Sequence, residues 1–118
     1  MTIEELVSRV FAVRNAAHLA HWATDSFSRH MALGDFYDKI IDQIDGIVET
    51  YQGYYGLMGD VAPMSFPYDD ICGLIADEAE QVAKARSTVC KGNTALENLI
   101  DGLSETYSTT FYKLANLK

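Results

Sequence analysis

The 118-residue sequence predicts an all-α protein, a single four-helix bundle that occupies residues 1–118. Apolar residues recur every three or four positions through most of the chain, whereas no segment shows the alternation of a half-buried strand. Both prolines, Pro63 and Pro67, fall within one segment, Gly53–Pro67, which divides the sequence into two halves that can each hold two helices. Hydrophobic residues make up 48% of the chain, which is enough for a core and argues against disorder.

The first helix is expected from about Ile3 to Trp22. Thr2 and Glu5 form a capping box, in which the hydroxyl accepts a hydrogen bond from a backbone N–H of the first turn and the carboxylate accepts one from the cap. The core-facing residues of this helix recur at helical spacing and are Leu6, Val10, Val13, Ala17 and Ala20.

The second helix is expected from about Arg29 to Tyr55. A short turn over residues 23–27 precedes it, and either Ser26 or Ser28 can cap it. Its core stripe repeats every three or four residues and consists of Leu33, Tyr37, Ile40, Ile44, Ile47, Val48, Tyr51 and Tyr55.

The third helix is expected to begin near Tyr68, with Asp69 and Asp70 in its first turn, where negative charge is favourable. Gly92 and Asn93 are expected to stop it. Its apolar residues are Ile71, Leu74, Ile75, Val82 and Val89.

The fourth helix is expected from about Thr94 to Leu117. Its apolar residues are Leu96, Leu99, Ile100, Leu103, Tyr107, Phe111 and Leu114. The linker between the two halves, about 11 residues from Leu57 to Pro67, can span at most about 36 Å. Two topologies therefore stay open: a loose hairpin loop, or a crossover connection along the bundle as in ferritin-like folds.

Charge and hydropathy exclude several classes of function. The net charge of −8 repels phosphate backbones, and no cluster of Lys and Arg offers an exception, so nucleic acid is not expected as a partner. No apolar run approaches the roughly 20 residues of a membrane helix. Acidic residues occupy the N-terminal stretch where a signal peptide has basic ones, so a cytoplasmic location is expected.

The two cysteines, Cys72 and Cys90, are expected to be reduced. If both lie on one helix, their spacing places them about 27 Å apart, which is beyond the reach of a disulfide. No CxxC motif occurs.

All three histidines, His18, His21 and His30, fall within a stretch of 13 residues. The first two lie one turn apart on the first helix, and the third lies just inside the second helix. Because a short turn joins these helices, we expect the three side chains near one end of the bundle.

Four carboxylates follow one face of the second helix: Asp38, Asp42, Asp45 and Glu49. They fall within about 60° of one another and about 145° from the core stripe, so they should point out of their own bundle. No Glu is followed three residues later by a His, which excludes the usual di-iron site inside a bundle.

A solvated acidic face is the simpler interpretation of this stripe. A bound cation, however, would relieve the repulsion of a few tenths of a kcal/mol between each pair of stacked acids. Imidazole and carboxylate ligands together suit iron, zinc or manganese.

One set of these residues resembles the signature of Dps proteins, the small ferritins that protect cells from iron and peroxide. The set consists of Ala20, His21, Trp22, Phe27, His30, Leu33, Phe36, Asp45 and Glu49. The acids follow His30 by 15 and 19 residues, as in that family. The resemblance covers most of the chain and is most specific over residues 16–50.

The resemblance implies a ferritin-like bundle with a crossover between the second and third helices, and a ferroxidase that oxidises Fe(II) and stores iron. It implies that His21 and His30 of one chain, with Asp45 and Glu49 of a two-fold mate, bind the iron. Trp22 would lie beside the iron and take up oxidising equivalents. It also implies a homo-oligomer, at least a dimer and then a dodecameric shell.

The sequence departs from the Dps pattern in four ways. The turn between the first and second helices is about three residues shorter than in that family, which changes the reach of His30. Gly34 stands where the family often has a carboxylate, with Asp35 about 100° round the helix, which removes a ligand of a second metal position. The segment between the second and third helices is shorter, and the chain has no basic tail. An alternative therefore remains: a non-catalytic structural or interaction protein, for example a phage-encoded one, that has kept the bundle. The roles of His18, Asp38 and Asp42 stay open.

Overall fold

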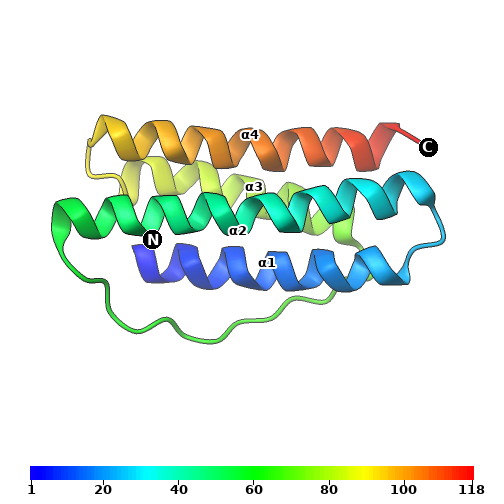
Figure 1. Ribbon diagram of the computed structural model, residues 1–118, viewed down its shortest axis with the longest axis horizontal. Helices are drawn as coiled ribbons and strands as arrows, with labels where there is room; N and C mark the ends of the chain where they lie inside the picture. The colour runs from blue at the N-terminus through cyan, green and yellow to red at the C-terminus, as the bar shows by residue number, and fades with distance from the viewer.

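The computed structural model describes all residues, Met1–Lys118, and confirms an all-α protein. It contains four helices and no strands. The helices are α1 (Ile3–Ala23), α2 (Phe27–Tyr55), α3 (Ile71–Thr88) and α4 (Thr94–Asn116). Figure 1 shows them side by side in an elongated bundle of 44 × 26 × 20 Å.

The helices form two antiparallel pairs, α1 with α2 and α3 with α4. α2 packs against α1 and α4, and α3 packs against α4 and α1, so α1 and α4 lie diagonally opposite. The segment from residue 56 to residue 70 runs the length of the bundle beside α1, so that α2 and α3 point in the same direction (Figure 1). The Ser8 hydroxyl donates a hydrogen bond of 2.6 Å to the Ala62 carbonyl, which holds this segment against α1.

Polar caps set the helix starts. Thr2 and Glu5 form the expected capping box at α1. Ser26 accepts a hydrogen bond from the Arg29 N–H at 3.3 Å, so α2 begins at Phe27, two residues before the expected start.

The expected start of the third helix was wrong. α3 begins at Ile71 rather than Tyr68, because Asp70 is its N-cap and accepts a hydrogen bond of 3.1 Å from the Gly73 N–H. Asp69 therefore lies before the helix. An N-cap is the residue just before the helix. Asp70 holds this position, so Asp69 and Asp70 mark the start of α3 and do not belong to its first turn.

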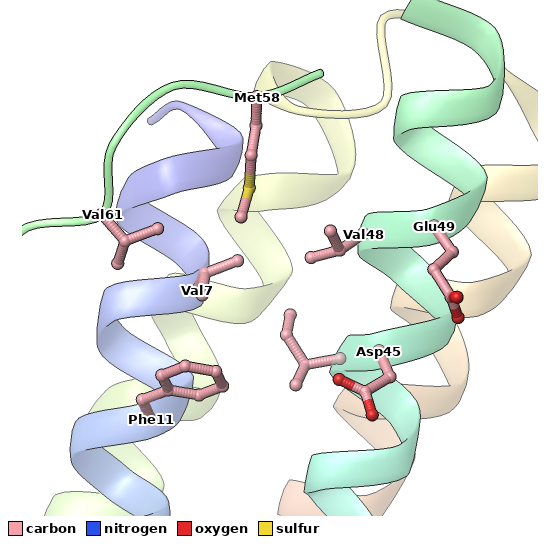
Figure 2. A pocket seen from close by; sticks show the side chains of 8 residues that line it. Val7, Phe11, Asp45, Val48, Glu49, Met58 and Val61 are labelled. Carbon is pink, nitrogen blue, oxygen red and sulfur yellow. The ribbon is translucent and has the colours of Figure 1, made fainter. Parts of the chain in front are cut away.

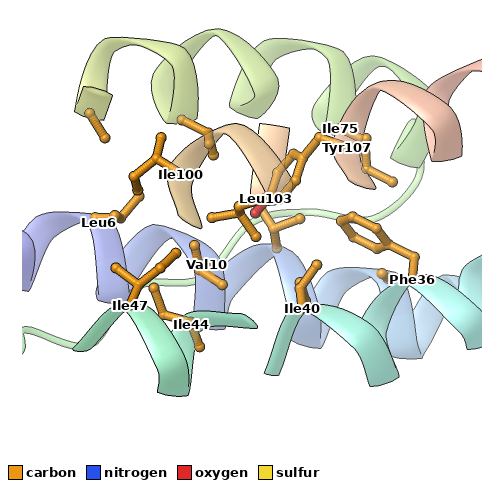
Figure 3. Close-up of a cluster of buried hydrophobic side chains, with 14 of the residues drawn as sticks. Leu6, Val10, Phe36, Ile40, Ile44, Ile47, Ile75, Ile100, Leu103 and Tyr107 are labelled. Atoms are coloured by element: carbon orange, nitrogen blue, oxygen red, sulfur yellow. The ribbon is translucent and has the colours of Figure 1, made fainter. Parts of the chain in front are cut away.

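One continuous hydrophobic core joins all four helices (Figure 3). Within it, the Phe36 and Tyr107 rings meet edge to face, with centroids 5.1 Å apart. Most residues of the expected core stripes are buried or half-buried. Three of them are instead exposed: Tyr55, Leu99 and Phe111. Tyr55 lies in the last turn of α2, where its ring contacts the Lys91 ammonium at 4.5 Å instead of the core.

No helix combines the length and the apolar character that a membrane span requires. Both cysteines are free thiols; Cys72 is half-buried and Cys90 is buried. Burial is the main cause that raises the pKa of the Cys90 thiol.

Candidate metal site

The last turn of α1 and the first turn of α2 hold His21 and His30 in a reciprocal pair. Nδ1 of His21 lies 2.6 Å from the carbonyl oxygen of His30, and Nδ1 of His30 lies 2.8 Å from the carbonyl oxygen of His21. The two rings stack with centroids 3.7 Å apart and planes 16° from parallel. The structure thus brings together the two histidines that the sequence singled out.

The crossed hydrogen bonds fix the tautomer of both rings. A carbonyl oxygen only accepts, so each Nδ1 must carry a proton and donate it. In a neutral ring this leaves the lone pair on Nε2, and metal-binding histidines in proteins commonly show this arrangement. An imidazole nitrogen binds a metal ion in the plane of its ring. Because the two ring planes are nearly parallel, both Nε2 atoms can bind the same ion only after one ring tilts.

His18 belongs to an aromatic stack beside this pair. Its ring lies 4.0 Å from that of Tyr37, nearly parallel to it, and 4.4 Å from that of Trp22. The side chain of Trp22 is 67% exposed although it stands next to His21 in the chain. The spacing of the histidines predicted their common location but not the participation of Tyr37, which the core stripe had assigned to packing alone.

Asp45 and Glu49 lie at the other end of α2. Both are exposed and border a groove of about 390 Å³ between α1 and α2. Figure 2 shows Val7 and Phe11 across this groove, with Met58 of the connecting segment at one end and Val61 beside Val7. Asp38 and Asp42 are exposed on the same helix and form no hydrogen bond or ion pair, so the four acids point away from the core as expected.

The histidines and the acids of one chain do not meet. His30 and Asp45 are 15 residues apart on α2. At 1.5 Å per residue they are therefore separated by about 22 Å. The chain contains no group of three or more His, Cys, Asp or Glu side chains placed to hold a metal ion. A site that uses all four residues therefore requires a second chain.

His30 and Asp45 nonetheless lie within about 60° of each other around α2. We use the term α1–α2 face for the outward surface of this helix pair, which carries Phe11, His18, Trp22, His30, Gly34, Tyr37, Asp45 and Glu49. It has a histidine end, an acidic end and an apolar groove beside the acidic end.

The close approach of Gly34 to the His21 ring did not follow from the sequence. A Cβ atom at this position would lie 3.0 Å from Cε1 of His21, so the absence of a side chain makes room for the ring. The only signal in the sequence was the presence of a glycine one turn after His30 within a helical pattern.

Residues 21–114 match the profile of a family described as a family of unknown function, DUF5856. No curated protein and no solved structure matches the chain.

Proposed function

Because the chain belongs to DUF5856, a family without an assigned function, we propose an activity from the site itself: a Dps-like ferritin that binds Fe(II) between two subunits and oxidises it. The observation that carries the proposal is the placement of two complementary half-sites on one face. The histidine end supplies two neutral nitrogen donors, and the acidic end supplies two anionic oxygen donors.

Two-fold symmetry would complete both half-sites at once. In an isologous dimer both chains use the same surface. A contact between the histidine end of one chain and the acidic end of its mate is therefore repeated with the chains exchanged. An axis that crosses the α1–α2 face between its two ends places the histidines of each chain against the acids of its mate. The exposed apolar groove beside the acids would be covered in the same contact.

The path of the chain supports a ferritin-like assignment of the bundle. α2 and α3 run in the same direction, and the connecting segment follows α1 between them. Ferritin-like bundles use a long crossover connection of this kind. A dodecameric shell in the cytoplasm that stores the oxidised iron is part of the proposal.

Iron is the substrate in this scheme. His21 and His30 bind Fe(II) through Nε2, while the Asp45 and Glu49 carboxylates of the mate hold the higher charge of Fe(III) better than that of Fe(II). Two Fe(II) ions each give one electron to one molecule of hydrogen peroxide, which takes up two protons and yields two molecules of water. Trp22, which follows His21 in the chain and is exposed, would take up an oxidising equivalent by giving peroxide its second electron when only one Fe(II) is available. Zinc and manganese would compete for the same donors.

Complementation between two inactive variants tests the proposal. One variant lacks the histidines (His21→Ala with His30→Ala), and the other lacks the acids (Asp45→Asn with Glu49→Gln). In a mixed dimer, one site carries both defects and the other is whole. Random mixing makes about half of the dimers mixed, so about a quarter of the sites should oxidise Fe(II) after co-refolding.

Asp38→Asn with Asp42→Asn is the matched control for the acids, because it removes the same charge from the same helix. This control should retain full activity alone. A co-refolded sample that exchanges subunits and stays as inactive as its parents would refute the shared site.

One observation favours the alternative, a structural or interaction protein without iron chemistry. The His21–His30 hydrogen bonds join the end of α1 to the start of α2, which gives both histidines a structural role of their own. On this alternative, loss of the histidines would lower the thermal midpoint, and neither wild type nor variant would oxidise Fe(II) faster than buffer.

A further inference from the structure

Gly34 differs from the other glycines of α2 in what surrounds it. A Cβ atom at residue 34 would lie 3.0 Å from Cε1, 3.3 Å from Nδ1 and 4.0 Å from Nε2 of His21. A Cβ atom at Gly46 or Gly53 would meet nothing within 4 Å. Gly34 is therefore the α2 glycine at which an added side chain would meet another residue.

This contact is one of three that confine the His21 ring. The ring of His30 covers one of its faces at 3.7 Å, and the carbonyl oxygen of His30 holds Nδ1 at 2.6 Å. The edge formed by Cε1 and the two nitrogens lies against Gly34. A methyl group there would have to push the ring by a few tenths of an ångström, which would lengthen the Nδ1 hydrogen bond or open the stack.

A glycine inside a helix is less favourable than an alanine, because it loses more backbone entropy on folding. At Gly34 this disadvantage is offset by the room it gives to an imidazole ring.

We infer that Gly34 is a positioning residue that lets His21 and His30 form their crossed pair, so that one chain supplies its metal ligands as imidazole nitrogens alone. This inference rests on the proposed function and specifies it. An aspartate or glutamate at residue 34, where the Dps pattern has a carboxylate, would place its Cβ atom 3.0 Å from Cε1 and 4.0 Å from Nε2 of His21, so the ring would have to shift. Gly34 is thus a part of the half-site rather than a lost ligand.

The chemistry of such a half-site follows from its donors. Two neutral imidazoles prefer borderline ions such as Co²⁺ and Zn²⁺, whereas Mg²⁺ and Ca²⁺ prefer oxygen ligands. The acid-free variant (Asp45→Asn with Glu49→Gln) should therefore retain Co²⁺ binding at the histidine end and fail to oxidise iron.

Four single variants test the inference: Gly34→Ala, Gly34→Asp and the controls Gly46→Ala and Gly53→Ala. Titration with Co²⁺ measures the affinity, and proton–nitrogen NMR of the histidine rings reports the two Nδ1–H groups in the absence of metal. The controls should raise the thermal midpoint and leave both other readouts unchanged. Gly34→Ala should lose the protected His21 Nδ1–H signal and bind Co²⁺ at least about tenfold more weakly.

Gly34→Asp separates the two interpretations of this position. It should weaken Co²⁺ binding at least as much as alanine does, and tighter binding would show that residue 34 is a lost ligand. Gly34→Ala with both signals and unchanged affinity would also overturn the inference. If wild type bound no Co²⁺, the proposed function would fail, and the NMR signals alone would decide whether Gly34 positions His21.

Discussion

Tyr107 shows how strongly the core can change the chemistry of a single residue. Its side chain is 1% exposed and meets the Phe36 ring edge to face. Burial raises the pKa of the Tyr107 phenol far above its usual range, and the negative charge of Glu78 raises it further. The phenol therefore stays protonated in the folded protein at alkaline pH, whereas in the unfolded chain it loses its proton near pH 10.

This difference predicts how stability depends on pH. The unfolded state binds fewer protons than the folded state above about pH 10, so the free energy of unfolding should fall as pH rises, by up to about 1.4 kcal/mol per pH unit from this group. Below that pH the contribution is constant. Tyr107→Phe should remove this slope, as measured by urea unfolding at a series of pH values. Tyr112→Phe, exposed on the same helix, is the control. Equal slopes for wild type and Tyr107→Phe would contradict the prediction.

At the same scale, the sequence predicted where the histidines gather but not how they interact. Their spacing around a short turn is enough to place His21 and His30 near each other. The crossed hydrogen bonds depend on the rotamers of both rings and on the backbone path of the turn, which no spacing rule contains. The role of Gly34 depends on an absent atom, so it became visible only once the His21 ring was located.

Among the elements, the connecting segment is the one whose path the sequence left open. Its length allowed either a loose loop or a taut connection along the bundle. Two polar contacts with α1 hold it: the Ser8 hydroxyl with the Ala62 carbonyl at 2.6 Å, and the Gly59 N–H with the Glu4 carboxylate at 3.0 Å. The sequence patterns assign no role to either α1 residue, because the segment they contact is distant in sequence.

Ser8→Ala should therefore loosen the segment more than it destabilises the bundle. Ser8 is buried, so its loss leaves the Ala62 carbonyl without its donor at a cost of about 1 kcal/mol. Hydrogen exchange at Gly59 and its neighbours should become about fivefold faster while exchange in the helices changes little. Ser87→Ala removes a hydroxyl that bonds only within α3 and is the control. Unchanged exchange at Gly59 would show that Ser8 does not hold the segment.

An ion pair links α1 and α3 closer to the core. Arg9 of α1 donates to both carboxylate oxygens of Glu78 on α3, at 2.9 and 2.8 Å. Glu78 is 5% exposed, so its charge is acceptable only with this partner. The sequence patterns did not predict this ion pair, because one acidic residue among apolar ones leaves the helical periodicity recognisable and does not reveal its burial. Helix types and core centres followed from periodicity, whereas boundaries and buried polar pairs required the tertiary contacts.

For the whole molecule, the α1–α2 face raises the question of assembly. The histidine end and the acidic end lie about 22 Å apart on α2, and neither is completed by its own chain. The face also exposes apolar groups that a monomer leaves in water, including Phe11 and Trp22. A second copy of the chain would account for both features. In the sequence, the outward direction of the acids and the Dps resemblance both led to the expectation of a homo-oligomer.

We therefore predict at least a dimer, and a dodecameric shell as the complete assembly, with Phe11 in the two-fold contact. Phe11 is 42% exposed and lines the groove beside Asp45 and Glu49. Phe11→Asp removes an apolar contact worth about 2 kcal/mol from each chain and adds a charge beside two acids. Because symmetry repeats the change, association should weaken at least about a hundredfold.

Leu99→Asp gives the matched control for this substitution, since Leu99 is 38% exposed and lies on α4, away from the α1–α2 face. Light scattering and sedimentation at micromolar concentration should find wild type and Leu99→Asp in the same oligomer and Phe11→Asp as a folded monomer by circular dichroism. That monomer should also lose iron oxidation, because its histidines no longer meet the acids of a mate. If wild type is a monomer, or if Phe11→Asp assembles as Leu99→Asp does, the acids and histidines do not meet through this face. A metal site shared between chains would then have no structural basis.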